Sequence, residues 1–556
     1  MSPPLNPPVD RSGDAPARLA APPAERGAAV VASLTAASRG MGLVRQVVAT
    51  AVVGLTFLGN TYSSTNTTSN LLFDLFAGGA LAAVVIPSLS AHLVSEDRAG
   101  LDHTASAFLN VALLWLTPVV VAGLLLRGPL MSALTSGVHD PGIRLQEEQL
   151  GSFLLLLFLP QVWLYGIGMV ATGALQAHHR FVGPAVAPLV SSLVVTVSYV
   201  MYAVVEGSHR HQLGAVTTAG RWILGLGTTA GVVVLTLSVL IPAWRLGLRW
   251  RPVLRIPAAA RSLTKRLLGS ALLAVAMEQA LLGLVLVVGN AVAGGVIAYM
   301  LAFSMLELPW AILAVPIAIA AFPGLAASVA AGDMDGFRSG SATATRNLIV
   351  LAMGGTAAML ALAGPGTRVL LDLGIHGGAR ADKLLAPAVA AFAPALLGYG
   401  AYALLTRVAY ALGDGRSPAL GAVAGFGTAT VLSLAAALAF SGPALIAALA
   451  GAFSVGITLG AAAMVVLVSR RTGRGVFAGS GPTLARAVAA GAAAAVIGAG
   501  LASLLHGNTL AAHLASLGAV AVATLAAYLF VLRLLGDHQL GQALTAARSG
   551  RPGRLA

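Results

Sequence analysis

The chain has 556 residues, of which 57% are hydrophobic and only 9% are charged, whereas soluble domains average about 25% charged residues. So few charged groups cannot cover a water-facing surface, and apolar runs of roughly twenty residues match a hydrocarbon core of about 30 Å, which excludes a soluble protein. The net charge of +14 comes from arginines in short loops between the apolar runs, as the positive-inside rule predicts, and not from the basic surface that a nucleic-acid partner requires.

Residues 1–27 are rich in proline, alanine and charges of both signs, so they cannot bury enough apolar surface to fold alone and are predicted to form a disordered cytoplasmic tail. The first apolar run begins near Ala28 and is long enough to span, which argues against a cleaved signal peptide. From there the hydropathy pattern predicts an all-α integral membrane protein with about fourteen transmembrane helices. Their expected positions are 29–54, 70–93, 104–127, 151–175, 183–205, 222–246, 267–289, 294–322, 345–365, 384–411, 418–440, 443–469, 484–505 and 511–535.

The first span carries a polar stripe on one helical face. Its members recur at steps of three or four: Thr35, Arg39, Gly42, Gln46 and Thr50, with Arg45 at the edge. An arginine inside a span is costly, so it normally faces a bundle interior or a wet cavity. One interpretation is a cationic wall that binds phosphate or carboxylate through the guanidinium fork. The alternative is that both arginines snorkel to the cytoplasmic interface.

The second span carries Asn66, Asn70, Asp74 and Gly78 at steps of four, which predicts a second polar stripe. Asp74 could form a structural ion pair with an arginine of the first span. Lone intramembrane carboxylates are also common coupling sites for ions or protons, so that role stays open for Asp74.

The chain contains an internal repeat. Residues 83–101 read AVVIPSLSAHLVSEDRAGL and residues 319–337 read IAAFPGLAASVAAGDMDGF, at an offset of 236. Residues 177–185 and 411–419 match at nearly the same offset. The offset covers six spans, an even number, so the two repeats should have the same orientation. This predicts an N-lobe at 28–246, a C-lobe at 267–469 and a substrate site between them, with the last two spans at 484–535 outside the repeat.

Orientation follows from the basic segment 247–266, which contains no acid and carries Arg249, Arg251, Arg255, Arg261, Lys265 and Arg266. Such a segment is predicted to be a cytoplasmic loop. An even number of spans then places both termini, including the tail 536–556, in the cytoplasm of a multi-pass inner-membrane protein. The first predicted outside loop, 55–69, has no charge.

The C-lobe contributes further candidate site residues. Glu278 lies in the seventh span, and Ser304 and Glu307 lie in the eighth, just before Leu308 and Pro309. A proline can bend a helix, and a carboxylate beside the bend would suit a gated cavity. A glutamate hydrogen-bonded to neighbouring spans is the alternative. Glu278 is the second candidate for ion coupling.

Motifs typical of enzymes are missing from the sequence. It contains no phosphate-binding loop and no paired-carboxylate motif at a membrane surface, and its loops are too short for a catalytic domain. There is no cysteine, and His178 and His179 have no third ligand at a metal-site spacing. We therefore expect neither an enzyme nor a metal or cofactor site.

Several short motifs, in order, resemble the MurJ (MviN) family of lipid II flippases. The amino-terminal part of the likeness is Ser38-Arg39-Gly40-Met41-Gly42-Leu43-Val44-Arg45, then Asn70-Leu71-Leu72, Gly78-Gly79-Ala80 and Pro87. It continues through Leu175-Gln176-Ala177, Glu307-Leu308-Pro309, Phe322-Pro323 and Arg407-Val408-Ala409-Tyr410-Ala411. The likeness runs from about Ala28 to Leu535, and the stretch 60–70 is most similar to actinobacterial members.

The resemblance implies a fourteen-helix fold of the multidrug/oligosaccharidyl-lipid/polysaccharide exporter superfamily. It also implies a cationic cavity between two lobes, a lipid-tail groove made by the last two helices, and flipping of the undecaprenyl-pyrophosphate-linked peptidoglycan precursor. Expected partners are membrane lipids, that lipid-linked precursor and cell-wall synthesis proteins. The candidate cavity residues are Arg39, Arg45, Gln46, Asn70, Asp74, Ser304 and Glu307.

This sequence departs from the family pattern in the cavity. It has Gln46 where many members have an acid, Phe73 and Asp74 where they have arginines, and Phe303 and Ser304 where they have Asp and Arg. Two alternatives therefore stand beside the flippase: a drug or secondary-metabolite exporter of the same superfamily, and a non-transporting scaffold of cell-wall assembly.

Overall fold

The computed structural model describes residues 23–536, except 96, 248–249, 256–257, 377–378 and 506. Within this range every regular element is a helix. The predicted tails 1–27 and 536–556 fall almost wholly outside the described residues. The exceptions are 536 and 23–27, and the structure shows 23–27 as the start of a helix and not as part of a tail.

The first half of the chain forms α1 (Pro23–Val53), α2 (Phe57–Phe73), η1 (Asp74–Gly78), α3 (Gly79–Val94), α4 (Arg98–Leu125), α5 (Arg127–Leu134), α6 (Pro141–Phe158), α7 (Gln161–Ala177), α8 (Val182–Glu206), η2 (Gly207–His209), η3 (Leu213–Ala215) and α9 (Thr218–Trp244). The second half forms α10 (Ala258–Gly289), α11 (Gly295–Pro309), η4 (Trp310–Ala314), α12 (Val315–Ala330), α13 (Met334–Asp372), α14 (Ala379–Phe392), α15 (Ala395–Ala411), α16 (Arg416–Ala439) and α17 (Pro443–Thr472). The chain then continues through η5 (Arg474–Phe477), α18 (Ser480–Leu504) and α19 (Leu510–Leu534).

Twelve helical segments of the described part are long and apolar enough to cross a membrane. In order, they coincide with the third to fourteenth predicted spans. The first two predicted spans correspond to α1 and to the continuous segment α2–η1–α3, which contain more polar residues. The prediction of an all-helical membrane protein is therefore confirmed.

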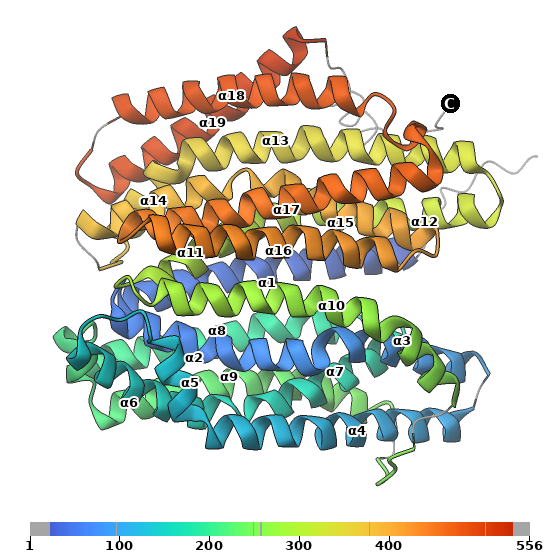
Figure 1. The fold of residues 1–556 in the computed structure, drawn as a ribbon, viewed down its shortest axis with the longest axis horizontal. Helices are drawn as coiled ribbons and strands as arrows, with labels where there is room; N and C mark the ends of the chain where they lie inside the picture. The colour runs from blue at the N-terminus through green and yellow to red at the C-terminus, as the bar shows by residue number, and fades with distance from the viewer. Residues whose placement is uncertain are drawn as a thin grey trace, which may run out of the picture.

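Figure 1 shows the two halves lying side by side, with α2–α9 in one layer and the helices from α11 onward in the other. Helix α1 lies between them and contacts α8 of the first half and α11 of the second. Helix α10 contacts both α3 and α16. The last two helices, α18 and α19, pack on α13, where the Tyr528 hydroxyl donates to the Val350 carbonyl at 2.6 Å. That these two helices form a lipid-tail groove stays a prediction.

The predicted outside loop at 55–69 is wrong, because α2 begins at Phe57 and most of its residues are buried. Polar residues can fill this helix because their hydroxyls donate to backbone carbonyls one turn earlier. Thr61 bonds to Phe57 at 2.9 Å and Thr65 to Thr61 at 2.8 Å. A sequence that reads as a polar loop is therefore a buried helix.

The basic segment 247–266 is shorter than predicted as a loop, because α10 already begins at Ala258. The described part, 250–255, runs along α4. The Asn110 side chain donates to the Arg251 and Val253 carbonyls at 2.7 and 3.1 Å. The three basic residues at 261, 265 and 266 therefore belong to the start of a helix.

The internal repeat recurs in local structure. Asp97 and Asp333 each cap the following helix, accepting from Gly100 and Gly336 N–H groups at 2.8 Å. The π-helical turns η1 and η4 begin at Asp74 and at Trp310, which is again an offset of 236 residues. A π turn inserts one residue into a helix and is a frequent feature of functional sites. Both repeats thus interrupt a long helix at the same position.

One end of the molecule is held shut by contacts between the halves, which we call the seal: Gly54, Leu55, Asn60, Asn290–Gly294 and His376. The Asn60 amide donates to the Val292 carbonyl at 2.8 Å, and its oxygen accepts from Val296 N–H at 3.0 Å. Leu55 N–H donates to the His376 carbonyl at 2.9 Å.

Gly294 allows this close approach of the halves. Its φ is +74°, and a Cβ there would lie 2.4 Å from the Leu55 carbonyl carbon. Any larger residue at this position would be both strained and in collision with backbone.

His211 of the first half stacks on His376 beside the seal, with ring centroids 4.3 Å apart. Burial, followed by the charges of His376 and Arg210, lowers the pKa of His211 to about 4, although an interaction with the Val53 backbone opposes this. In an opened seal the pKa should return towards its ordinary value of about 6.5. Acid should therefore favour opening: the stability of the closed seal is fully present above pH 6.5 and is lost as the pH falls towards 4.

We expect the thermal stability of the purified protein to fall between about pH 6 and pH 4, and His211→Phe to reduce that fall. Phenylalanine keeps a stacked ring but cannot take up a proton. The matched control is His209→Phe, since His209 is exposed close by. An unchanged pH profile in His211→Phe would show that the stacked pair does not sense pH.

Candidate functional site

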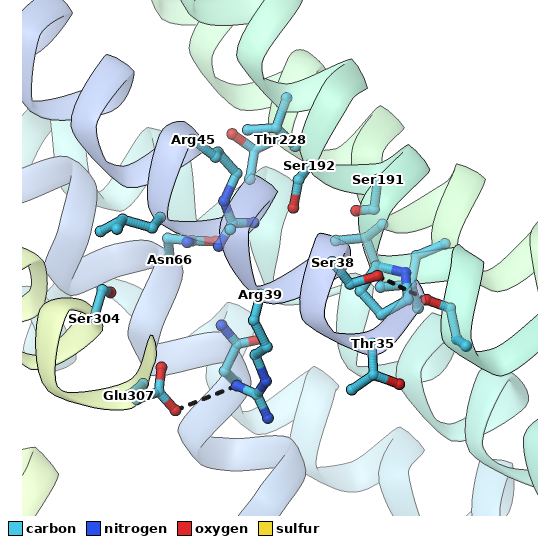
Figure 2. Close-up of a pocket in the computed structure, with 18 of the residues that line it drawn as sticks. Thr35, Ser38, Arg39, Arg45, Asn66, Ser191, Ser192, Thr228, Ser304 and Glu307 are labelled. Atoms are coloured by element: carbon cyan, nitrogen blue, oxygen red, sulfur yellow. Dashed lines mark hydrogen bonds and ion pairs between the residues drawn. The ribbon is translucent and has the colours of Figure 1, made fainter. Parts of the chain in front are cut away.

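A cavity of about 510 Å³ opens between the halves, and a second of about 260 Å³ adjoins it (Figure 2). Their walls come from α1, α2, α7, α8 and α9 of the first half and from α11 of the second. The two cavities share Arg45, Asn66, Asn70, Ser304 and Glu307. We treat them as one central cavity.

Helix α1 turns its polar stripe towards this cavity. Thr35, Arg39, Gly42 and Arg45 line it, as their helical spacing predicted. The helix is fixed beside α8 by Ser38, whose hydroxyl donates to the Ala185 carbonyl at 2.7 Å. Figure 2 shows both arginine side chains extending into the cavity. In this structure the two arginines therefore face the cavity, as the first interpretation of the stripe expects.

Arg39 forms an ion pair with Glu307 of α11, with Nη1 3.4 Å from Oε1. The side chains are 47% and 32% exposed, and such a pair is worth at most about 1 kcal/mol. It connects the two halves across the cavity. The structural ion pair expected for Asp74 is not made in this state, because Glu307, 268 residues away in the sequence, is the partner of Arg39.

Arg45 has no hydrogen-bond or ion-pair partner within the described part of the chain. Its charge does interact with the hydroxyl groups of Tyr62 and Tyr199 on the cavity wall. The Tyr62 hydroxyl is itself 2.7 Å from both the Tyr199 and Thr228 hydroxyls. The guanidinium therefore stands in a polar, half-buried setting with its donors available to an anion.

The structure places the other predicted site residues as follows. Gln46, Asn70 and Ser304 line the central cavity. Asp74 and Glu278 do not line either part of it and are exposed. Glu278 is nevertheless close enough to Asp74 and Glu307 for their charges to interact. Ion coupling through Asp74 or Glu278 stays a prediction.

Sequence reasoning missed part of the wall. Ser191 and Ser192 of α8, Thr228 of α9 and Tyr165 of α7 line the cavity. Isolated hydroxyl residues in apolar helices do not indicate a cavity wall from the sequence alone, since most of them form hydrogen bonds with the backbone of their own helix. On the second-half side, Phe303 packs edge-on against Phe392 and Phe453 at centroid distances of 5.6 and 5.4 Å. An apolar ring, that of Phe303, thus lies where the motif resemblance led us to expect a charged residue.

The profile of the family described as Lipid II flippase MurJ matches residues 49–519. The chain belongs to the lipid II flippase MurJ family. It is a multi-pass membrane transporter and not an enzyme. The resemblance in the short motifs is thereby confirmed at the level of the family. The match begins after Arg39 and Arg45, so it carries no information on either arginine.

Individual relatives agree with the family. A probable lipid II flippase MurJ of Synechocystis sp. is 27% identical over 406 residues, covering 70% of this chain and 72% of the relative. Another from Rhizobium tropici is 26% identical over 542 residues, covering 94% and 96%.

Solved structures agree on the fold. A lipid II flippase MurJ in an inward closed conformation superimposes with a TM-score of 0.70 at 14% identity, covering 94% of this chain and all of that one. An inward-facing multidrug resistance MATE family transporter of the MOP superfamily gives a TM-score of 0.61 at 13% identity, covering 81% and 99%. At this identity the likeness concerns the fold alone.

Proposed function

We propose that this chain flips lipid II, the undecaprenyl-pyrophosphate-linked peptidoglycan precursor, across the bacterial inner membrane by alternating access. The observation that carries the proposal is Arg45, a guanidinium in a cavity between the two halves that has no partner among the described residues. A planar guanidinium donates two parallel hydrogen bonds to a phosphate. Arg45 is the group that we assign to the pyrophosphate.

The other polar groups would complete a headgroup site. Asn66, Asn70 and Ser304 provide hydrogen-bond donors and acceptors around Arg45, which suits a sugar and a peptide. Among the described residues that line the cavity, the charged groups are two arginines and one glutamate, so these lining residues carry a net positive charge of one. A positive cavity favours an anionic substrate.

The Arg39–Glu307 ion pair would be broken when the substrate binds. A pyrophosphate entering the cavity competes with Glu307 for the guanidinium, and the exposed pair is weak enough to be displaced. Since the pair joins the two halves, its exchange for substrate links binding to their relative motion.

Removing the carboxylate should free Arg39 for the substrate. We expect Glu307→Gln to strengthen binding of a soluble pyrophosphate headgroup analogue by up to about fivefold, because a surface pair is worth about 0.2–1 kcal/mol. Its melting temperature should stay close to that of the wild type. Asp335→Asn, which breaks the exposed pair with Arg338 at 2.9 Å, is the control. Weaker binding by Glu307→Gln would mean that the carboxylate itself holds the substrate.

The function is tested directly by reconstitution. Vesicles containing the protein should translocate lipid II, and depletion in the source organism should accumulate the precursor on the inner leaflet. Drug sensitivity without precursor accumulation would favour the exporter instead. The rings of Phe303, Phe392 and Phe453 beside the cavity are the observation that supports that second candidate.

We infer further that the end bearing Ser95 is cytoplasmic, which places both termini there. The support is the basic segment ending at Lys265 and Arg266, whose described part lies at that end, where Arg98 donates to the Leu246 carbonyl at 3.1 Å. Membership of the actinobacterial branch and contacts with cell-wall synthesis proteins are also proposals, supported by the motif likeness alone.

Single cysteines in this cysteine-free chain test the orientation. Ser441→Cys, in the exposed turn between α16 and α17, should react with an impermeant thiol reagent in intact cells, whereas Ser95→Cys should not. Thr65 is unsuitable as a probe because it is fully buried. The reverse labelling pattern would overturn the orientation.

A further inference from the structure

Glu147 of α6 is a carboxyl group outside the central cavity that is completely buried, with 0% exposure. It faces α2, where its Oε1 lies 3.0 Å from the Thr61 hydroxyl. Its Oε2 has no hydrogen-bond partner in the described part of the chain. The transport scheme above gives this residue no role.

The hydrogen bonds around Glu147 indicate its protonation state. The Thr61 hydroxyl also lies 2.9 Å from the Phe57 carbonyl, which can only accept. A hydroxyl has one proton to donate, so it cannot serve both the carbonyl and an ionised carboxylate. If Glu147 is protonated, it donates to Thr61, and Thr61 donates to Phe57. Only the carboxylic acid allows both of these hydrogen bonds to form at once.

Within the described residues, no charge on the elements packed against α6 compensates an ionised Glu147. Arg144, on its own helix, pairs with Glu148 at 3.0 Å. On the helices that pack against α6, Arg127 of α5 donates to the Leu124 carbonyl, and Tyr62 of α2 bonds to Tyr199. Arg221 of α9 and Tyr165 of α7 make no hydrogen bond or ion pair with Glu147, and η3 carries no titratable group. A buried carboxylate without a cation is strongly disfavoured, so the group stays neutral.

The neighbouring residue has the opposite surroundings. Glu148 accepts hydrogen bonds from the Arg144 guanidinium and the Ser132 hydroxyl, at 3.0 and 2.9 Å, and the Thr135 hydroxyl lies 3.3 Å away. These partners favour an ionised carboxylate. Glu148 is therefore a matched control: the same residue type, on the same helix, one position away.

We propose that Glu147 is a proton-binding site and that closing the seal takes up one proton there. Glu147 lies six residues into α6, about 9 Å from the start of that helix. Its partner Thr61 is adjacent to Asn60, which holds the seal. Opening the seal admits water, and the acid gives its proton to that water. Closing reverses the step: the carboxylate takes a proton from hydronium and leaves water behind.

The inference rests on the alternating-access part of the proposed function, but its test needs no substrate. Spin labels or fluorophores at His139→Cys and Ser441→Cys, two exposed positions on opposite halves, report opening by their distance. Between pH 7 and pH 9 the ratio of open to closed molecules should rise by up to tenfold per pH unit in the wild-type background, the limit for one proton. His211, with a pKa of about 6.5 even in the opened seal, is mostly neutral in this window and changes the ratio by less than about twofold.

Glu147→Gln should abolish this response, with less than a twofold change over the same range, since an amide donates to Thr61 at every pH. Glu148→Gln should respond like the wild-type background. Glu147→Asp, which still titrates, should keep a response with a shifted midpoint. Infrared spectroscopy of the cysteine-free protein at pH 7 should show a protonated-carboxyl band that is lost in Glu147→Gln and kept in Glu148→Gln.

These experiments test the proton site separately from the proposed substrate. A pH response that survives in Glu147→Gln, or an infrared band unaffected by it, overturns the proton site. If Glu147→Gln does not fold, Glu147→Asp tests the proton site in its place. The measurements are again the pH dependence of the label distances and the position of the infrared carboxyl band. Failure of lipid II translocation with an intact Glu147-dependent response would reject the proposed substrate and leave the proton site standing.

Discussion

Arg45→Lys should lower the affinity for lipid II or a soluble pyrophosphate headgroup analogue by roughly ten- to a hundredfold. The loss corresponds to about 1.5–3 kcal/mol, the contribution of a hydrogen bond to a charged group. Lysine keeps the charge but cannot make two parallel hydrogen bonds to one phosphate. Arg45 has no partner in the described part of the chain, so the substitution breaks no contact of the protein and should not lower its stability.

The measurement is binding to purified protein together with complementation of a flippase-depleted strain, at equal amounts of protein in the membrane. Arg127→Lys, at an exposed position away from the cavity, is the control. Arg39→Lys should also impair complementation, but by less, because lysine can still pair with Glu307. Asp74→Asn should do little harm unless Asp74 couples an ion. Normal function of both lysine variants would refute the phosphate role of the arginines.

Asn60→Leu should open the seal. The substitution leaves the Val292 carbonyl and the Val296 N–H without partners in a buried site. Each unsatisfied group costs about 1–3 kcal/mol. Together they should weaken the closed state by at least about 2 kcal/mol, which shifts the ratio of closed to open molecules by roughly 30-fold or more. This is the largest conformational effect that we expect from one substitution.

The labelled positions 139 and 441 measure this shift at a fixed pH of 7.5, where neither His211 nor a change in proton concentration complicates the result. Thr68→Val is the matched control on the same helix, since the Thr68 hydroxyl is buried but bonds only to its own helix, at Ser64. If Asn60→Leu stays closed while Thr68→Val does the same, the contacts of Asn60 are not what holds the halves together.

Several features of this protein could be predicted from local sequence. The positions of the apolar spans follow from hydropathy, because burial in a bilayer is decided residue by residue along a helix. The caps at Asp97 and Asp333 lie in repeated sequence and form by contacts within three residues. The face of α1 that carries Arg39 and Arg45 follows from helical periodicity, and the structure turns it to the cavity.

Where a polar residue finds its partner could not be predicted in the same way. Glu307 and not Asp74 pairs with Arg39, although Asp74 is far closer in sequence. The stretch 57–69 looked like a loop because its hydroxyl and amide groups appeared to need water. In the structure they are satisfied by the preceding helical turn and by the backbone of the second half.

The sequence by itself determined that this is a helical membrane protein with an internal repeat and a cationic stripe, because hydropathy, periodicity and family motifs are properties of the chain read in order. Only the tertiary structure distinguished Glu147 from Glu148. Adjacent glutamates on one helix point to different neighbours: Glu147 meets a single hydroxyl of α2, whereas Glu148 meets Arg144 of its own helix and two hydroxyls at α5 and its C-terminal end. The charge state of a buried carboxyl is set by its surroundings, and those come from residues distant in the sequence.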